Sequence, residues 1–455
     1  MHDGSRDSDG HQKPGEAAIY QRESNLRESN QREIDQREGN LKDSDRRDFL
    51  KTGLTTSAGG IAAASGLGGL TMPQVGRGSS SAGTPGIQRY GRLGRTEIQI
   101  SDISFGSSRL RTGEEDLVRH ALDLGINYFD TADSYTSGQS ETVIGRALTP
   151  SERDKVTVIS KSKAWANDDW QSIMGALDGS LRRLQMDYVD VYFNHAVNDK
   201  DRLDNPEWFE FVERAKAAGK IQFTGMSGHA GRLIDVIDYA VDKDLVDVLL
   251  VSYNFGQDPA FYESLIKSFN RIATQEGLPG ALARAKEKDI GVIAMKTLMG
   301  ARLNDMRPYE DQGATFSQAA FHWTLSNPNV DALVVSMTGI EQMNEYVGAS
   351  GGKQVSTVEA DLLRRYAALN GTSYCRQACN DCSGACPYGV PIADVLRTRM
   401  YATDYEDVEF ARLEYAELTP NAEACLSCSG EPCANACTHG LDIAAWCAPT
   451  HRMLA

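Results

Sequence analysis

Eight short apolar runs alternate with amphipathic helical segments between residues 103 and 335. This alternation predicts parallel strands joined by helices, because a strand that returns in parallel needs a crossover connection. Eight such units over about 260 residues favour an α/β fold of the closed (β/α)8 TIM-barrel type over an open doubly wound sheet. No Gly-x-Gly-x-x-Gly motif follows the first run, which argues further against the open sheet. The runs are Ile103–Phe105, Ile126–Phe129, Val156–Ser160, Tyr188–Phe193, Gln222–Met226, Val246–Ser252, Gly291–Met295 and Ala332–Val335.

We place the barrel domain at residues 87–352. Residues 87–100 contain two β-prone runs around a Gly-containing turn, the pattern of a hairpin before the first barrel strand. From Trp170 to Leu184, apolar residues spaced three and four apart mark one helical face, with Asn167 or Asp168 as the predicted N-cap.

Residues 1–43 have a composition that cannot support a core. From Gln21 the sequence cycles through a five-residue polar repeat, and apolar residues are nearly absent. Neither a helix nor a heptad repeats every five residues. We therefore predict a disordered, repetitive polar tail.

Residues 44–86 have the architecture of an export signal. The pair Arg46-Arg47 is followed by Phe49, Leu50 and Lys51, and residues 52–76 carry no charge. The pattern resembles a twin-arginine signal, and the run is too weakly apolar to anchor in a bilayer. It predicts export by the twin-arginine machinery to the periplasm or cell envelope, although no Ala-x-Ala site defines the cleavage point. The alternative is a linker that contains a chance arginine pair.

Four polar residues lie at or just beyond the ends of three consecutive predicted strands: Asp130, Tyr135, Lys161 and His195. Taken singly, each has a structural explanation, such as a capped turn or a solvated rim. Together they form a chemical set, since the carboxyl ends of barrel strands meet at one mouth. A lysine ammonium held by a carboxylate favours the phenolate of a nearby tyrosine, and a histidine can orient a carbonyl oxygen. The set predicts proton transfer to a carbonyl oxygen while a hydride reaches the carbon.

The segments INYFDTADSYTSGQSETVIGRAL, SLRRLQMDYVDVYFNH and GKIQFTGMS resemble the aldo-keto reductase family. The resemblance implies that Tyr135 is the general acid/base, that Lys161 and Asp130 tune it, and that His195 orients the substrate. Lys163 is the competing lysine, and we prefer Lys161 because the apolar strand runs directly into it. The implied substrate is a small carbonyl or sugar-like compound.

The same resemblance implies a nicotinamide cofactor, NAD or NADP, at Ser227, Met295, Lys296, Ser336 and Gln342. Because an exported enzyme meets little free nicotinamide, we expect the cofactor to be tightly bound. Ser227 matches the carboxamide partner, and Met295 stands where an aromatic ring is expected to stack on the nicotinamide. Ser336 and Gln342 stand where a lysine and an arginine often hold the 2′-phosphate of NADP, for which Lys296 could partly compensate. Three further positions depart from the family pattern: Gly228, Leu250 and Tyr346.

All nine cysteines lie within the last 81 residues, which points to one specialised module at residues 353–455. The two runs are Cys375-x3-Cys379-x2-Cys382-x3-Cys386-Pro387 and Cys425-x2-Cys428-x4-Cys433-x3-Cys437. They resemble two-cluster ferredoxins, in which the fourth cysteine of each run ligates the other cluster. The resemblance implies two [4Fe-4S] clusters, although Thr438 replaces the second proline. Residues 392–418 look helical, which favours a mainly α-helical ferredoxin-like domain.

Two alternatives to iron–sulfur clusters remain open. Exported proteins often carry disulfides, but cysteines this crowded would force short, strained loops. Zinc usually draws its four sulfurs from two separated knuckles. Cys447 lies outside both runs and is predicted to be a buried bystander.

The sequence therefore predicts an exported oxidoreductase with a barrel for hydride chemistry and a module that exchanges electrons with a redox partner protein. We expect the module to fold back toward the barrel mouth. The net charge of −16 argues against a nucleic-acid partner. One alternative is an electron-transfer or binding protein whose barrel is a non-catalytic scaffold. Another is that the clusters only shape the mouth.

Overall fold

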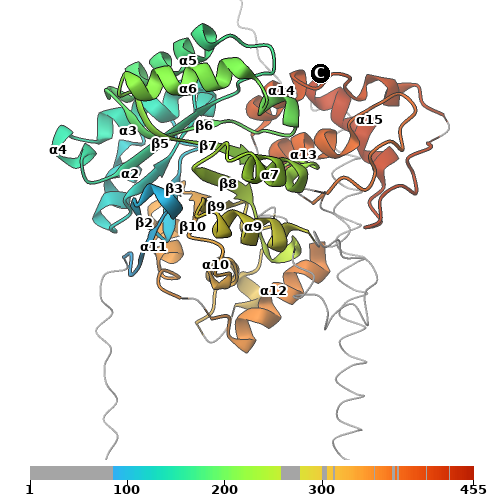
Figure 1. Ribbon diagram of the computed structural model, residues 1–455. Coiled ribbons are helices and arrows are strands. Elements are labelled where there is room, and N and C mark those ends of the chain that lie inside the picture. The colour runs from blue at the N-terminus through green and yellow to red at the C-terminus, as the bar shows by residue number, and fades with distance from the viewer. Residues whose placement is uncertain are drawn as a thin grey trace, which may run out of the picture. The chain divides into compact units, whose positions relative to one another are not determined.

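The computed structural model describes residues 86–257, 277–299, 305–310, 313–352, 354–370, 375–376, 379–405, 407–429 and 431–455. Over this part of the chain the predicted fold is confirmed: eight parallel strands close into a barrel with helices outside it, and further helices follow at the C-terminus (Figure 1). The predicted tail and all but the last residue of the predicted signal segment lie outside the described residues. Within the described part, no helix has the length and apolar character needed to span a bilayer.

The barrel strands follow one another around the ring in chain order, and β10 closes the barrel by pairing with β3. Every neighbouring pair in this ring is parallel. All side chains of β5 and β6 are buried, which explains why neither strand alternates between core-facing apolar and solvent-facing polar residues. The strands are β3 (Ile103–Gly106), β4 (Tyr128–Asp130), β5 (Thr157–Ser162), β6 (Val189–Asn194), β7 (Ile221–Gly228), β8 (Val248–Ser252), β9 (Gly291–Met295) and β10 (Ala332–Ser336).

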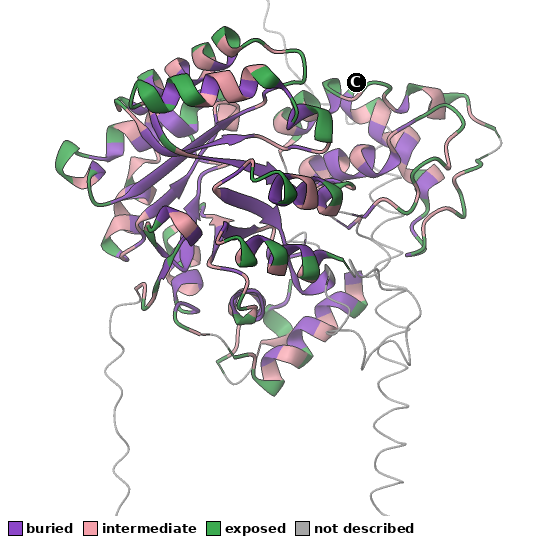
Figure 2. Cartoon of the chain, viewed as in Figure 1, coloured by how far each residue is buried: buried purple, intermediate pink, exposed green. Residues whose placement is uncertain are grey.

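Amphipathic helices form the outer layer and turn their polar faces to solvent, so that burial is concentrated in the strands (Figure 2). The helix α5 is capped by Asp169, whose carboxylate accepts from the backbone N–H of Ser172, and not by Asn167 or Asp168 as predicted. Asp168 instead accepts from the N–H of Trp165 in the preceding turn. The helices around the barrel are α2 (Glu115–Asp123), α3 (Gln139–Ala147), α4 (Pro150–Arg153), α5 (Trp170–Leu184), α6 (Pro206–Ala217), α7 (Leu233–Asp242), α9 (Leu278–Glu287), α10 (Phe316–Ser326) and α11 (Ile340–Val347).

The predicted N-terminal hairpin is confirmed as β1 (Tyr90–Arg92) and β2 (Gln99–Ser101). Its Leu93 and Ile100 are fully buried and join the cluster of side chains that fills the barrel interior. Gly94 in the turn has a φ of 49°, and an added Cβ would lie 2.2 Å from the backbone nitrogen of Gly291. Only glycine allows this approach, and the hairpin packs against the start of β9.

The C-terminal segment contributes to two different cores. Helix α12 (Thr357–Asn370) packs on α10 and belongs to the main core of the barrel. Helices α13 (Ile392–Thr403), α14 (Val408–Ala416) and α15 (Ile443–Leu454) surround a separate small core, against which cysteines of both runs pack. Residues 392–418, which were predicted to be helical, thus contain two helices, α13 and α14. We call residues 375–455 the cysteine module.

Candidate active site

The four predicted catalytic residues meet at one end of the barrel. Asp130 ends β4, and Tyr135 lies in the loop between β4 and α3. Lys161 is the next-to-last residue of β5, and His195 directly follows β6. The Lys161 ammonium donates to Asp130 Oδ1 at 2.8 Å and lies 3.3 Å from the Tyr135 hydroxyl. The rings of Tyr135 and His195 are 5.6 Å apart in an edge-on arrangement. The structure thus brings together all four residues that the sequence singled out.

Lys161 is held as a buried cation within this group. Its side chain is fully buried, and its ammonium also donates to the backbone carbonyl of Thr131 at 2.6 Å. Burial lowers the pKa of Lys161 and raises that of Asp130, while the contact between the two opposes both shifts. Removing either partner would leave the other charge buried alone, which costs several kcal/mol.

The expectation that the Tyr135 phenol is acidified is wrong for this structure. Burial raises the pKa of Tyr135 well above its ordinary value, and Asp130, Tyr401, Glu414 and Asp133 raise it further. These effects outweigh the ammonium at 3.3 Å. The phenol is therefore kept protonated, which is the form that a proton donor requires.

His195 is kept neutral. Burial lowers its pKa well below the ordinary value, and the charges of Lys161 and Lys163 lower it further. Its Nδ1 is buried and has no hydrogen-bond partner among the described residues. The backbone around it is fixed by Arg202, which donates to the carbonyl of His195 at 2.8 Å and to Asn194 Oδ1 at 2.6 Å. A neutral imidazole in this position can donate one hydrogen bond and accept another.

The competing Lys163 has a different role. Its ammonium forms ion pairs with Glu414 at 3.0 Å and with Glu417, both contributed by the end of α14 and the residue after it. Burial alone would lower the pKa of Lys163, but these two carboxylates reverse the shift and raise it. The geometry therefore agrees with the preference for Lys161 in the catalytic set and assigns Lys163 to the contact with the cysteine module.

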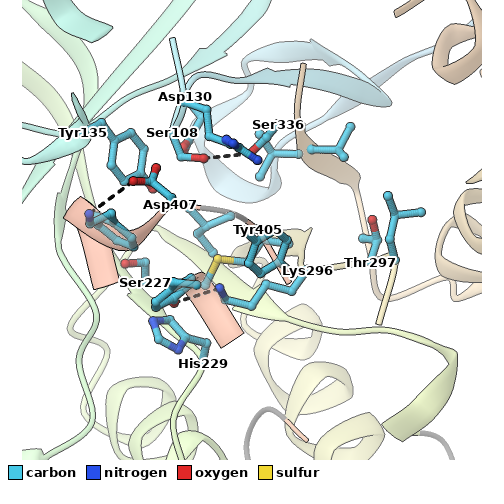
Figure 3. Close-up of a pocket in the computed structure, with 18 of the residues that line it drawn as sticks. Ser108, Asp130, Tyr135, Ser227, His229, Lys296, Thr297, Ser336, Tyr405 and Asp407 are labelled. Carbon is cyan, nitrogen blue, oxygen red and sulfur yellow. Dashed lines mark hydrogen bonds between the residues drawn. The ribbon is translucent and has the colours of Figure 1, made fainter. Parts of the chain in front are cut away.

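A cavity of about 200 Å³ opens at these residues (Figure 3). All five residues predicted to bind a nicotinamide line it: Ser227, Met295, Lys296, Ser336 and Gln342. The Ser227 hydroxyl accepts from the N–H of Ala196 at 2.9 Å, which fixes it beside His195. The hydroxyl of Ser336 is 2.7 Å from that of Ser108.

Two of these five residues, Gln342 and Lys296, form hydrogen bonds with other residues of the pocket. Gln342 uses its side-chain oxygen to accept from the N–H of Thr338 at 2.8 Å. The Lys296 ammonium donates to the Tyr401 hydroxyl at 3.1 Å, and burial lowers its pKa. The backbone of Lys296 has a φ of 57°, unusual for a residue with a Cβ. The contact with Tyr401 thus binds the barrel to α13.

Several buried polar atoms of the pocket lack a hydrogen-bond partner in the described part of the chain. They are Asp130 Oδ2, His195 Nδ1, His229 Nδ1 and Thr297 Oγ1. Leaving such groups unpaired costs about 1–3 kcal/mol each, so unsatisfied atoms in a cavity point to a polar ligand. A carbonyl substrate and the carboxamide of a nicotinamide offer matching donors and acceptors. The residues therefore fit that cofactor.

The cysteine module completes this pocket, as predicted from the need to bring electrons to the mouth. Its aromatic and acidic side chains that line the cavity are Tyr401, Tyr405, Asp407, Phe410 and Glu414. Sequence reasoning missed all five, because they come from a different domain and no local pattern marks them. It also missed His229, although this residue lies only two positions beyond a segment that carries the family resemblance.

The eight cysteines of the two runs form two groups, and each group takes its fourth member from the other run. Burial raises the pKa of Cys375, Arg397 opposes this, and the neighbouring Cys379, Cys382 and Cys437 add to the rise, so that the pKa is about 12. Burial likewise raises the pKa of Cys425, and the neighbouring Cys386, Cys433 and Cys428 add to the rise. We call Cys375, Cys379, Cys382 and Cys437 the first thiol group, and Cys386, Cys425, Cys428 and Cys433 the second thiol group.

These groups have the composition of two iron–sulfur sites. All nine cysteines are free thiols, and Cys447 is buried in the core of the module. An exchange of the fourth cysteine is the arrangement of two-cluster ferredoxins. A second metal-ligand set overlaps the first thiol group: single ligand atoms of Cys379, Asp381 and His439 all lie within 4.8 Å of one another. That set could hold one metal ion instead of a cluster.

The family that known proteins suggest for this chain concerns its barrel. A model of the Aldo/keto reductase family matches residues 103–309. The uncharacterized oxidoreductase YqkF of Bacillus subtilis is 24% identical over 302 residues, which cover 61% of this chain and 96% of that protein. L-galactose dehydrogenase of Arabidopsis thaliana is 26% identical over 295 residues, covering 56% of this chain and 86% of that protein. The solved holo form of aldo-keto reductase AKR11C1 from Bacillus halodurans is 22% identical, covers 61% of this chain and 95% of its own, and has a TM-score of 0.47.

Proposed function

We propose that this protein, whose residues 103–309 match the Aldo/keto reductase family, is a nicotinamide-dependent oxidoreductase that interconverts a carbonyl and an alcohol at Tyr135. It also exchanges electrons through two [4Fe-4S] clusters. The observation that carries the first part is the contact chain from Asp130 through Lys161 to the Tyr135 hydroxyl, inside a pocket. The substrate is a small carbonyl or sugar-like compound. The electrons pass to or from a redox partner protein.

In reduction, the carbonyl oxygen accepts hydrogen bonds from the Tyr135 hydroxyl and from the neutral His195. Tyr135 then transfers its proton to that oxygen. Lys161 stabilises the resulting phenolate, and Asp130 keeps the ammonium in place. Proton donation by a positioned side chain contributes about 10²–10⁴-fold to the rate.

A bound nicotinamide supplies or accepts the hydride in this reaction. Ser227 would hold its carboxamide, and Met295 would pack on its ring. Ser336 and Gln342 would hold the adenosine end, and these uncharged side chains lack the charge-assisted bonds that select NADP. An exported enzyme meets little free nicotinamide, which supports tight retention of the cofactor.

The two thiol groups would each hold one [4Fe-4S] cluster, with the iron bound by thiolates. The exchange of Cys386 and Cys437 between the groups supports this assignment over a pair of independent zinc knuckles. Four cysteines gathered in one group also argue against disulfides, because each disulfide joins only two cysteines in a specific geometry.

We place the protein outside the cytoplasm, exported by the twin-arginine route as a folded protein with its clusters already inserted. Support comes from the sequence around Arg46 and Arg47. Replacing both with lysine should leave the protein in the cytoplasm of cells that express it, as measured by fractionation. Export of the double variant at the normal rate would contradict this localisation.

A second function is a non-catalytic barrel that acts as a scaffold for electron transfer or binding. It is favoured by the departures at the nicotinamide-binding positions. The intact contact chain from Asp130 to Tyr135 argues against it.

The deciding experiment combines composition with activity. Native protein should contain about eight iron and eight sulfide per chain and a nicotinamide nucleotide by mass spectrometry. Tyr135→Phe should lower kcat for reduction of a small aldehyde about 10²–10⁴-fold with unchanged iron content. Unchanged activity in Tyr135→Phe would favour the scaffold. Zinc in place of iron would instead point to the Cys379, Asp381 and His439 set.

A further inference from the structure

A second cavity lies between the barrel mouth and the cysteine module, and its volume is about 560 Å³. It touches the catalytic pocket, because four residues line both: Ala196, His229, Tyr401 and Glu414. It also reaches both thiol groups, since Cys382 of the first and Cys386 of the second line it. A volume of this size is typical of cofactor sites. The cavity therefore connects the place of hydride chemistry with the place of single-electron chemistry.

These two chemistries do not match in electron number. A nicotinamide gives up two electrons together as hydride, whereas an iron–sulfur cluster accepts one electron. Flavins accept a hydride and release electrons singly. We propose that the second cavity binds a flavin that converts the two-electron reaction of the barrel into one electron for each cluster. This inference rests on the proposed function, because it needs both the nicotinamide and the clusters.

The electrons and atoms balance without another reactant. The flavin accepts a hydride at N5, so that the C4–H bond of the reduced nicotinamide breaks as the N5–H bond forms. The two clusters then take one electron each. The N5–H bond breaks, and its proton is released to His229 or to water. The flavin returns to its oxidised form, and the redox partner protein finally takes both electrons.

The walls of the second cavity suit this ligand. Trp165 lines it and is 45% exposed, while the Arg202 guanidinium lies 4.6 Å from the centre of its ring. An exposed indole is a surface on which the flat isoalloxazine ring can stack. Arg397 also lines the cavity and is only 3% exposed. Its guanidinium is paired with Asp394 at 2.7 Å, and Asp394 also lines the cavity, so Arg397 would offer the flavin hydrogen-bond donors near the ring nitrogens rather than an unpaired positive charge.

Arg397 also connects the cavity to the first thiol group. Its guanidinium donates to the backbone carbonyl of Cys379 at 3.3 Å. On the same helix, one turn later, Tyr401 accepts from Lys296 in the catalytic pocket. One face of α13 therefore runs from the nicotinamide-binding region to the cysteines, beside the proposed flavin.

His229 lines both cavities and provides a proton acceptor there. Figure 3 shows it in the catalytic pocket. Its buried Nδ1 has no hydrogen-bond partner among the described residues. Burial, and then the charges of Lys296, Arg397 and Lys163, lower the pKa of His229 well below its ordinary value. The ring is therefore neutral and can accept a hydrogen bond or, transiently, a proton.

The test is an FMN titration of the holoprotein, followed by the quenching of flavin fluorescence. We expect saturable binding of one FMN per chain that excess NADP⁺ does not displace. Trp165→Ala should weaken binding about tenfold through the loss of stacking. Trp170→Ala is the matched control, because Arg214 lies 4.2 Å from its ring centre and Trp170 lines neither cavity. It should bind FMN normally.

A kinetic readout complements binding. Added FMN should accelerate cluster reduction by NADH at least about tenfold in the wild type and much less in Trp165→Ala, measured by stopped-flow absorbance. Absence of saturable binding in protein that contains iron and reduces an aldehyde would overturn the flavin proposal and leave the proposed function intact. Displacement of FMN by NADP⁺ would also overturn it, by placing the flavin in the catalytic pocket. Protein without iron would overturn both proposals.

Discussion

In the barrel mouth, the polar groups hold one another in place: Lys161 donates to Asp130, to a backbone carbonyl and toward Tyr135. In the cysteine module, burial first and then the neighbouring thiols of the same group raise the pKa of Cys375 and of Cys425. The barrel also has an extensive core, whereas the module packs around a small one that includes cysteines at its edge. The comparison indicates that the barrel site is formed by the protein alone. We therefore expect the module, with its proposed clusters, to depend on bound metal for its shape, because a small core supplies little stability.

The largest expected effect tests the dependence of the module on metal. Cys386→Ser should remove the cluster of the second thiol group, although Cys386 belongs to the first cysteine run, and lower the iron from about eight to about four per chain. Since metal binding of this kind contributes on the order of 10 kcal/mol to folding, α14 and α15 should lose protection from hydrogen exchange while α5 keeps it.

Two comparisons make this result decisive. Cys447→Ser should keep the full iron content, because Cys447 belongs to neither thiol group. Cys437→Ser should remove the other cluster, as seen by electron paramagnetic resonance. If Cys386→Ser and Cys375→Ser abolish the same signal, the two groups do not exchange their fourth cysteine.

A smaller effect distinguishes the roles of Lys161, the next-to-last residue of β5, and Lys163, which follows the strand. Lys161→Met should lower kcat for aldehyde reduction about 10²–10³-fold, because it removes the cation that stabilises the Tyr135 phenolate. Lys163→Met should change kcat less than about threefold and raise KM a few-fold, because it loosens α14 over the pocket. Steady-state kinetics distinguish the two, and the reverse pattern would reassign the catalytic lysine.

The smallest effect concerns Asp133, which lies in the loop beside the catalytic group. Burial, and then the nearby Glu141, raise the pKa of Asp133 to about 6. Because the folded pKa is above the unfolded value of about 3.9, this residue favours the folded state only below about pH 4, and that contribution is lost as the pH rises through 6. Asp133→Asn should therefore stabilise the protein at pH 7 by about 2–3 kcal/mol and flatten its stability between pH 4 and 6.

Thermal unfolding at several pH values measures this difference. The exposed Asp123→Asn on α2 serves as the control and should change stability by less than about 0.5 kcal/mol. A pH dependence that is the same in Asp133→Asn and in the wild type would show that Asp133 is not the group responsible.

The barrel was predictable because its strands are buried on both faces and therefore read as continuous apolar runs. The positions of Asp130, Lys161 and His195 followed from the rule that parallel strands end at one mouth. Other features depend on contacts that no local pattern encodes. Burial is the main cause of the raised pKa of Tyr135, and Tyr401 and Glu414 of the cysteine module add to it, so the direction was predicted wrongly.

Smaller errors have local causes. The N-cap of α5 is Asp169, because the alternative Asp168 is used by the preceding turn. The helical prediction for residues 392–418 agrees with α13 and α14, although the composition does not mark the break between them. Sequence reasoning thus located the catalytic groups but not the aromatic and acidic side chains that cover them.

The pairing of Lys163 with Glu414 joins residues 251 positions apart in the chain. During synthesis, the barrel strands leave the ribosome well before α14 does. Until then, a nascent barrel has its catalytic groups in place beneath an open mouth. Closure of the pocket therefore comes last, and a polypeptide truncated before residue 408 would have Tyr135 but none of the wall that α14 provides.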